Sequence, residues 1–320
     1  MAEIESTRDA YGDALVQIGT DEKVTVLDAD VSTCTKSCFF GESYPERFYN
    51  VGIAEANMVG VAAGMAACGL KPFVHSFAMF SVGRVFDQIR NSVAYPHLNV
   101  KIVGTHAGLT VGEDGATHQC LEDLALMRSI PGMVVVAPAD GRETREAVQS
   151  LANYEGPAYL RLGRMALQTV TAVEGYQFEL GKAALMRPGK DVTIIANGIM
   201  VAKALEAAAA LAEAGIDARV LNMHTIKPID KEAIVRAAKE TGCIVTAEEH
   251  NVLGGLGAAV AEVVTETVPV PVLKVGTEDT FGRSGNAEAL LKRYGLTSEN
   301  IIQKAMLLVN DKEDHKIGVH

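Results

Sequence analysis

Short apolar runs alternate with helical patterns along almost the whole of this 320-residue chain. Runs such as KVTVLDAD (23–30), LKPFVHSF (70–77) and NVKIVGTHAG (99–108) are mostly apolar, with polar side chains at or near their ends. A strand of this kind must be covered on both faces, which is typical of a parallel sheet flanked by helices. The sequence therefore predicts an α/β fold. In such sheets, ligands bind beyond the carboxyl ends of the strands, where His75, His106 and the acids of LDAD fall.

A break in this pattern divides the chain into two predicted domains, as its length favours. The first covers residues 1–168 and includes an amphipathic helix over 84–95. The pattern breaks from Arg164 to Lys182, which we interpret as a linker plus an entry strand, the linker covering 169–182. A smaller, doubly wound domain follows over 183–320, and we expect its charged end, 310–320, to fray. Further strands are predicted over 132–138 and 157–163, and then over 191–198, 217–225, 243–250 and 271–276.

Charge and composition exclude several classes of protein. The net charge of −11 argues against nucleic acid or an anionic membrane as the main partner. The longest apolar run, Met58 to Leu70, falls short of the roughly 20 residues that a membrane span needs. The polar, acidic N-terminus does not resemble a secretory signal. Five scattered cysteines indicate free thiols in a reducing cytosol, so we expect a cytoplasmic protein.

Two glycine-rich stretches and one cysteine pair are weak as functional motifs. Residues 175–183 (GYQFELGKA) have the wrong spacing for a phosphate loop and place Ala183 where Ser or Thr is needed. Residues 254–259 (GGLGAA) lack the full dinucleotide-binding spacing, so close packing of the backbone is the better explanation. Cys34 and Cys38 have no second pair of ligands, and we predict no metal site in this chain.

Glu55 lies at the head of a helix that is otherwise built of small and apolar residues, in NVGIAEANMVGVAAGMAACG (50–69). An ionised carboxylate is rarely buried alone, because removing the charge from water is expensive. A helix-start carboxylate favoured by the helix dipole is one explanation. A functional acid is the other.

Three stretches, taken together and in this order, carry a family resemblance. They are GIAEANMVGVAAG with Glu55, PFVHSFAMF with Phe77 and Phe80, and THAGLTVGEDGATHQ with His106, Asp114 and His118. They resemble the pyrimidine-binding domain of transketolase-like, thiamine-diphosphate-dependent enzymes. The later residues GKAALM, IIANGIMVAKAL and EEHNVLGGLG are similar to that family's C-terminal domain. The resemblance thus implies a pyrimidine-binding domain followed by a transketolase C-terminal domain.

The resemblance assigns expected roles around the cofactor. It implies that Glu55 hydrogen-bonds N1′ of the aminopyrimidine and favours the tautomer that removes the thiazolium C2 proton. It implies that Phe77 and Phe80 form the apolar wall on which the pyrimidine stacks. Asp30, at the end of LDAD, matches a family acid near the thiazolium ring. Plain core packing for the two phenylalanines, and the capping of a turn by Asp30, are the alternative interpretations.

It also implies a substrate channel. His106 and His118 would hydrogen-bond the C1 and C2 oxygens of a ketose and assist proton transfer, while Asp114 would read a hydroxyl configuration. Arg164 matches an arginine that binds the substrate's terminal phosphate. Arg161, in the same YLRLGR segment, and Arg8, in STRDA, are further candidates for this contact. A surface salt bridge is the alternative for these arginines.

One family motif is missing. These enzymes bind the cofactor diphosphate through Mg²⁺ on a Gly-Asp-Gly motif, and this chain has none. The resemblance therefore implies the C-terminal subunit of a split transketolase. A separate N-terminal chain would supply the Gly-Asp-Gly site and hold the Mg²⁺, and we expect a heterotetramer of two copies of each chain.

Several reactions fit the same pair of domains. Ketol transfer between sugar phosphates is favoured by His106 together with GEDG (112–115). Deoxyxylulose-phosphate synthase is an alternative, since Arg84 matches an arginine of that enzyme, although it typically has arginine where His106 stands. A 2-oxoacid dehydrogenase β subunit and a non-catalytic binding subunit are the remaining alternatives. Which ketose and aldose are used is left open.

Overall fold

Six parallel strands form most of the first sheet in the computed structural model, which describes residues 4–317. β2 and β5 are buried along their whole length, as the continuous apolar runs predict. The prediction of a parallel sheet is therefore confirmed. In spatial order, the six strands are β6 (Val134–Val136), β7 (Ala158–Arg161), β5 (Lys101–Thr105), β4 (Lys71–Phe77), β2 (Val24–Asp28) and β3 (Phe48–Asn50).

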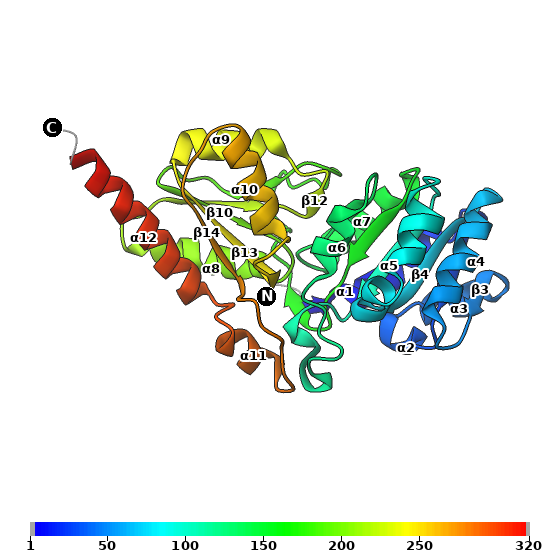
Figure 1. The fold of residues 1–320 in the computed structure, drawn as a ribbon. Coiled ribbons are helices and arrows are strands. Elements are labelled where there is room, and N and C mark those ends of the chain that lie inside the picture. Colours follow the sequence, from blue (N-terminus) through cyan, green and yellow to red (C-terminus); the bar gives the residue numbers. More distant parts are fainter. Residues whose placement is uncertain (1–3, 318–320) are drawn as a thin grey trace.

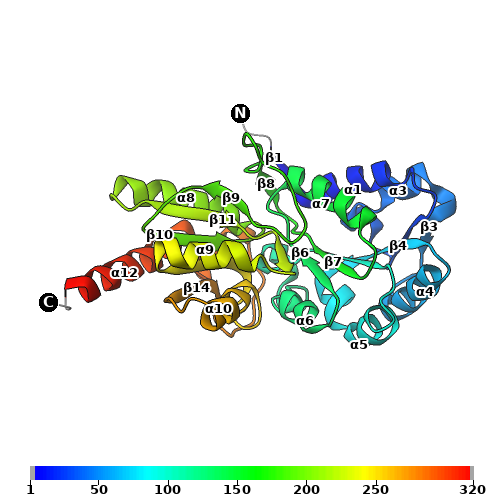
Figure 2. The ribbon, with the colours of Figure 1, turned by 90° about the horizontal axis from the view of Figure 1, so that it is seen from above.

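Helices cover this sheet on both faces, as Figure 2 shows from above. One face carries α1 (Thr7–Ile18), α3 (Cys38–Ser43) and α7 (Gly141–Asn153), and α1 packs against both α3 and α7. The opposite face carries α4 (Glu55–Ala67), α5 (Phe86–Gln88) and α6 (Asp123–Ser129), and the short α2 (Ser32–Thr35) follows β2.

The second half of the chain forms a smaller sheet beside the first (Figure 1). Its order is β14 (Val272–Thr277), β13 (Ile244–Asn251), β10 (Val192–Ala196), β11 (Ala218–Asn222) and β9 (Ala184–Arg187), with only β9 antiparallel. Helices α8 (Met200–Glu213) and α12 (Ser298–Ile317) pack together, as do α9 (Lys231–Thr241) and α10 (Leu256–Glu266). The short α11 (Ala287–Arg293) packs against the loop 109–114 of the first half.

Two predicted helical features differ in the structure. The helix predicted over 84–95 is regular α-helix only in α5, and its remainder, Ile89–Ala94, is π-helical. Val85, Ile89 and Val93 are nevertheless fully buried, so the apolar spacing marks the buried face but not the type of helix. The tail was expected to fray from residue 310, and this is wrong up to Ile317, because α12 runs that far. Residues 318–320 lie outside the described part.

A strand from the second half of the chain completes the first sheet. The strand predicted over 217–225 is divided into β11, which belongs to the second sheet, and β12 (Thr225–Lys227). β12 pairs antiparallel with β6 at the edge of the first sheet. Between Arg164 and Lys182, where a linker and an entry strand are expected, the structure has β8 (Ala166–Gln168), which pairs with β1 (Ile4–Ser6). The β12–β6 and β1–β8 pairings both involve three-residue strands, which are too short to show an alternating apolar pattern.

Glu143 on α7 joins three segments of the chain at the boundary between the halves. Its carboxylate is fully buried and accepts hydrogen bonds from the Asn222 side chain (2.8 Å), the Ala139 amide (2.5 Å) and the Tyr176 hydroxyl. Burial raises the pKa of Glu143 to about 7, although these hydrogen bonds act in the opposite direction. The carboxylate thereby connects α7, the connecting segment and β11.

We predict that Glu143→Ala lowers the free energy of unfolding by about 3 kcal/mol, because three buried donors lose their acceptor. Chemical denaturation of the variant and the wild type measures this difference. Gln149→Ala, at an exposed position of the same helix, is the control and should change stability by less than about 0.5 kcal/mol. Equal stability of the Glu143 variant and the wild type would contradict the prediction.

No helix within residues 4–317 combines the length and the apolar character that crossing a membrane requires.

Candidate active site

The carboxyl ends of the parallel strands bring four rings together. β4 ends at Phe77, and β5 ends one residue before His106. The Phe77 ring lies 4.0 Å from the His106 ring and 6.3 Å from the rings of Phe80 and His118, measured between centroids. Phe80 contacts His118 edge-on at 5.2 Å. Four side chains to which the resemblance assigns roles thus lie together beyond the ends of β4 and β5.

Glu55 begins α4 and lies beside this group of rings. Its side chain is only 3 % exposed, and its two carboxylate oxygens accept hydrogen bonds from Ser76 Oγ (3.3 Å) and Arg84 Nη1 (2.9 Å). The Arg84 guanidinium also lies over the Phe80 ring, at 4.3 Å from its centroid. Glu55 is thus a buried acid with one exposed cationic partner, since the Arg84 side chain is 49 % exposed.

Two arginines lie on the other side of His106. Arg8 Nη1 is 3.4 Å from His106 Nε2, and Arg8 Nη2 donates to the Arg164 carbonyl at 3.2 Å. Arg164 donates to the Val111 carbonyl at 2.5 Å and keeps 40 % of its side chain exposed. Burial lowers the pKa of Arg8, and nearby Arg164 acts in the same direction. Arg164 also forms a surface ion pair with Glu113 at 3.7 Å, the alternative named for it above. The two guanidinium groups still gather positive charge in an acidic protein, which suits a phosphate or another oxyanion.

His106 is held as a neutral imidazole between these groups. Thr105 Oγ1 lies 2.9 Å from its Nδ1, and the backbone φ of His106 is +56°, in the left-handed region. Burial lowers the pKa of His106 to about 3, and the positive charges of Arg8 and Arg164 add to this effect. At neutral pH the ring can therefore donate or accept a hydrogen bond without carrying charge.

Three of the predicted site residues lie apart from the rings. Asp30 is exposed and accepts a hydrogen bond from Asn50 (2.8 Å). The neighbouring Asp28 caps the turn after β2, through Val31 N at 2.6 Å and Thr35 Oγ1 at 2.8 Å. Asp114 shares the loop of the two histidines but points its exposed side chain to solvent. The structure therefore gives Asp30 and Asp114 no contact that would test their expected roles.

Arg161, the third of them, differs from the expectation of a substrate-binding arginine. Its side chain is 7 % exposed, and its Nε donates to Asp123 Oδ2 at 2.7 Å. Burial is the largest single effect and acts to raise the pKa of Asp123. The Arg161 charge, nearby His250 and the hydrogen bonds from Arg161 and Tyr159 together outweigh it, so the pKa lies below its ordinary value. Arg161 is the last residue of β7, and its side chain lies at the boundary between the halves of the chain, where Nη2 donates to the Glu249 carbonyl at 2.8 Å. It forms a buried ion pair and is not exposed for a phosphate. His75, which the strand pattern places at the same edge, is also buried and bonds to Tyr11 and to the Leu27 carbonyl.

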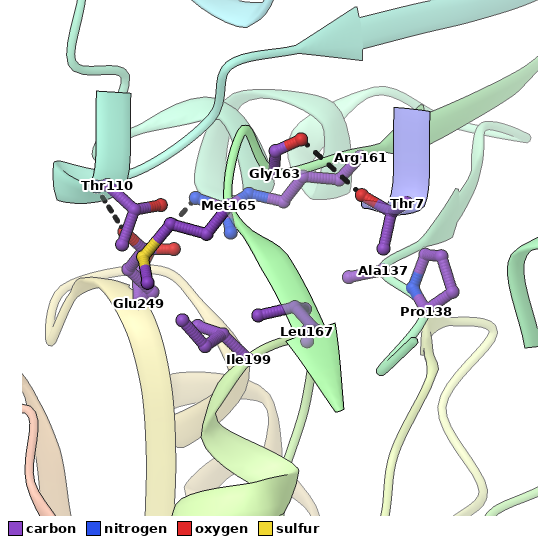
Figure 3. A pocket seen from close by; sticks show the side chains of 11 residues that line it. Thr7, Thr110, Ala137, Pro138, Arg161, Gly163, Met165, Leu167, Ile199 and Glu249 are labelled. Atoms are coloured by element: carbon purple, nitrogen blue, oxygen red, sulfur yellow. Dashed lines mark hydrogen bonds between the residues drawn. The ribbon is translucent and has the colours of Figure 1, made fainter. Parts of the chain in front are cut away.

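A small cavity lies at the same boundary, as the close-up in Figure 3 shows. Thr7 and Arg161 line it from the first half of the chain, and Ile199 and Glu249 line it from the second. Its volume of about 20 Å³ holds about one water molecule, so it is too small for a sugar. The ring cluster, which has the partly exposed Arg84 and Arg164 nearby, is therefore the better candidate site.

Sequence reasoning missed two features of the site. Ser76 precedes Phe77 on β4 and reaches Glu55, a contact that only the pairing of β4 with its neighbours reveals. Glu249 on β13 is 4 % exposed and accepts the Thr110 amide hydrogen bond at 2.7 Å. Two adjacent acids in a buried strand, EEH at 248–250, are the signal that could have indicated it. Within residues 4–317, no three His, Cys, Asp or Glu side chains gather in a way that could hold a metal ion.

Comparison with known proteins identifies the family. Residues 5–169 match the transketolase pyrimidine-binding domain, and residues 181–301 match the transketolase C-terminal domain. The chain therefore belongs to the transketolase family. It corresponds to the C-terminal section that split members of this family carry as a separate chain.

Three similar proteins support this placement. The 6-deoxy-6-sulfo-D-fructose transketolase subunit SqwH of Clostridium sp. strain MSTE9 is 48% identical, over 93% of this chain and 92% of that protein. One of the apulose-4-phosphate transketolase subunits of Phocaeicola vulgatus is 42% identical, over 94% and 97%. A solved structure described as a split-gene transketolase, an inactive β4 tetramer, has a TM-score of 0.89 and 51% identity. It is matched over 99% of its own chain and 96% of this one.

We predict that His106→Asn reduces the loss of stability in acid. The unfolded state takes up a proton on His106 near its reference pKa of 6.5, while the folded state resists this until a pKa of about 3. Wild-type stability therefore falls as the pH drops below 6.5, by about 1.4 kcal/mol per pH unit from this group. Asparagine is a suitable replacement because it tolerates the left-handed backbone at this position.

Urea denaturation between about pH 6.5 and 4.5 measures the effect, and the difference between variant and wild type should change by about 2 kcal/mol. His97→Asn is the matched control, because His97 is exposed and also has a left-handed φ of +56°. Parallel pH profiles for wild type and His106→Asn would contradict the buried neutral imidazole.

Proposed function

We propose that this chain is the C-terminal subunit of a two-chain, thiamine-diphosphate-dependent transketolase. It transfers a two-carbon ketol unit from a ketose phosphate to an aldose phosphate. The observation that carries the proposal is the buried Glu55 carboxylate beside the rings of Phe77, Phe80, His106 and His118. The names of the similar subunits, with sugars as substrates, support the same class of reaction.

The residues present fit the aminopyrimidine of the cofactor. A flat heterocycle needs an apolar face to stack on, and Phe77 and Phe80 offer two half-buried rings inclined by 30°. A protonated ring nitrogen needs a carboxylate that is shielded from water, and Glu55 is 3 % exposed. When bound, thiamine diphosphate would supply a nucleophilic carbon that carries the two-carbon unit. Glu55 would hold the proton at the ring nitrogen. Arg84 would then have to share the Glu55 carboxylate with the ring or move away from it.

The polar residues around the rings suit a sugar phosphate. His106 and His118 would hydrogen-bond the hydroxyl and carbonyl oxygens, His106 as a neutral donor or acceptor at working pH. Arg164 and Arg8 would bind the terminal phosphate or an equivalent oxyanion. We keep Asp114 as a candidate for reading a hydroxyl group and Asp30 as a candidate near the cofactor.

A partner chain would complete the site on the open side of Glu55. The face of α4 that points away from the core carries small residues, and neither Gly60 nor Gly64 has a neighbour near the place of a side chain. Ile53, just before the helix, is 77 % exposed, and Val61 is 39 % exposed. Exposed apolar side chains beside a small-residue helix face favour a protein–protein contact. We propose that an N-terminal subunit with the Gly-Asp-Gly site supplies Mg²⁺ there, in a heterotetramer.

We predict that Glu55→Gln lowers ketol transfer by at least about 100-fold while the fold stays intact, because the amide cannot hold the ring-nitrogen proton. The assay mixes the chain with its candidate N-terminal partner, thiamine diphosphate and Mg²⁺, and measures both ketol transfer and pyruvate decarboxylation. Glu46→Gln, at an exposed acid, is the control. Wild-type turnover in Glu55→Gln would refute the role of this acid. Activity with pyruvate alone would show that the enzyme acts on a 2-oxoacid and is not a transketolase.

We also predict that Gly60→Leu prevents assembly without harming the isolated chain. The helix gains a better helix former at a position with open space, so the melting temperature should stay equal or rise by a few degrees. A leucine on the small-residue face should block close approach of another chain. Analytical ultracentrifugation of the mixed subunits measures assembly, with Ala209→Leu on the exposed side of α8 as the control. Normal assembly of Gly60→Leu would show that the interface lies elsewhere.

A further inference from the structure

The loop that carries both site histidines, residues 106–119, is fastened to the second half of the chain at three points. The Thr110 amide donates to Glu249 Oε1 at 2.7 Å, near the start of the loop. The Gly285 amide donates to the Gly112 carbonyl at 3.4 Å, in the middle. Gln119 Nε2, at its end, donates to the Arg283 carbonyl at 2.9 Å. These contacts come from β13 and from the segment before α11.

The buried side chains of the loop pack against both halves of the chain. Leu109 is fully buried, and it packs in the apolar cluster of the second half, which includes residues of β10 and α8. His106, three residues earlier, packs on Phe77 of the first half. The chain thus crosses from one core to the other within the loop. Any relative displacement of the two halves would therefore change the position of His106 or strain the loop.

The shape of the loop is one that local sequence preference does not favour. His106 has a φ of +56°, which costs a side-chain-bearing residue free energy, and Gly108 follows with a φ of +84°. A Cβ atom on Gly108 would lie 2.3 Å from the carboxyl carbon of Glu249. Glycine at this position allows the carboxylate to approach the loop backbone. The conformation is held by contacts from outside the loop, and the Glu249 contact is the shortest of the three hydrogen bonds.

Glu249 is itself rigidly supported, as Figure 3 shows. Its carbonyl accepts a hydrogen bond from Arg161 Nη2 at 2.8 Å, and Arg161 is fixed by the ion pair with Asp123. Burial raises the pKa of Glu249 to about 6, against the effects of Arg161 and of the Thr110 hydrogen bond. An ionised carboxylate that is buried destabilises the fold unless hydrogen bonds or opposite charges compensate for its loss of water. The contact that its side chain makes is to the loop.

We propose that Glu249 is a positioning residue, through which the C-terminal domain holds the Thr110 amide and so keeps His106 and His118 against Phe77. The second half of the chain would contribute to the site by fixing the loop. The meaning of this role for catalysis rests on the proposed function. The anchoring of the loop does not.

The test compares Glu249→Ala with Glu249→Gln in the full-length chain assembled with its partner. Hydrogen exchange followed by mass spectrometry reports the amides of residues 107–119. We expect Glu249→Ala to speed their exchange by about 10- to 100-fold, the factor that a hydrogen bond to a charged group contributes. Glu249→Gln keeps an oxygen that accepts from Thr110 and should restore most of the protection.

Ketol-transfer kinetics in the same samples give a second readout. Glu249→Ala should lower kcat by about tenfold or more, because His106 and His118 lose their fixed position. Glu143→Ala is the matched control, since Glu143 is also a buried acid that joins the two halves but has no contact with the loop among those the structure describes. It should lower stability while leaving loop exchange and kcat unchanged.

Unchanged exchange of residues 107–119 in Glu249→Ala would overturn the positioning role, and so would equal opening of the loop in Glu143→Ala. Equal opening in Glu249→Gln and Glu249→Ala would also overturn it, because the accepted hydrogen bond would then not be the cause. A wild-type assembly that transfers no ketol unit would overturn the proposed function, while the exchange comparison would still decide the anchoring.

Discussion

Parallel pairing of β4 with β5 and of β5 with β7 is the constraint on which the candidate site depends. The register places Phe77 opposite Thr105 and Gly104 opposite Arg161. His106 therefore leaves the sheet beside the Phe77 ring, and the chain after Arg161 leaves on the other side of His106. A shift of one residue in either pair would turn His106 to the opposite face of the sheet. Main-chain hydrogen bonds thus fix the relative positions of an aromatic ring, an imidazole and a guanidinium group from distant parts of the sequence.

Buried charges at the boundary between the halves are the second constraint. Asp123 and Arg161 are each costly to bury alone, but paired at 2.7 Å they satisfy one another, and the Tyr159 hydroxyl donates a further bond to Asp123 at 2.6 Å. Charged pairs of this kind have strict geometry, because a small displacement leaves an unpaired charge in a dry environment. The pair itself lies within the first half of the chain, but it fixes Arg161, whose Nη2 donates to the Glu249 carbonyl of the second sheet at 2.8 Å. Through that bond it favours one relative placement of the two sheets.

Much of this arrangement could be predicted from the sequence, because it depends on local patterns. The apolar runs identify the parallel strands, and polar residues at their ends identify the edge where the rings meet. What could not be predicted depends on contacts between distant segments. β12 is a three-residue strand, too short for a periodic pattern to predict its pairing with β6. The sequence around Arg161 would read the same whether its side chain faced a ligand or Asp123. The resemblance implies a cofactor role for Glu55, which stays a prediction, and it could not show that Arg84 contacts the same carboxylate.

The Arg84 contact limits what can bind at Glu55. A buried carboxylate that loses its cationic partner needs another donor, since an unpaired charge at 3 % exposure is expensive. Arg84 also covers the Phe80 ring at 4.3 Å, so a flat ligand that stacks there competes with the guanidinium for the same face. A ligand can replace both interactions only if it combines an aromatic face with a hydrogen-bond donor at its edge. An aminopyrimidine has both, whereas a sugar phosphate alone has neither the flat ring nor an apolar surface. On the proposed function, charge and shape would therefore set the order of contacts at this site. The ring would engage Glu55 and Phe80, and the sugar would be left to the imidazoles and to Arg8 and Arg164.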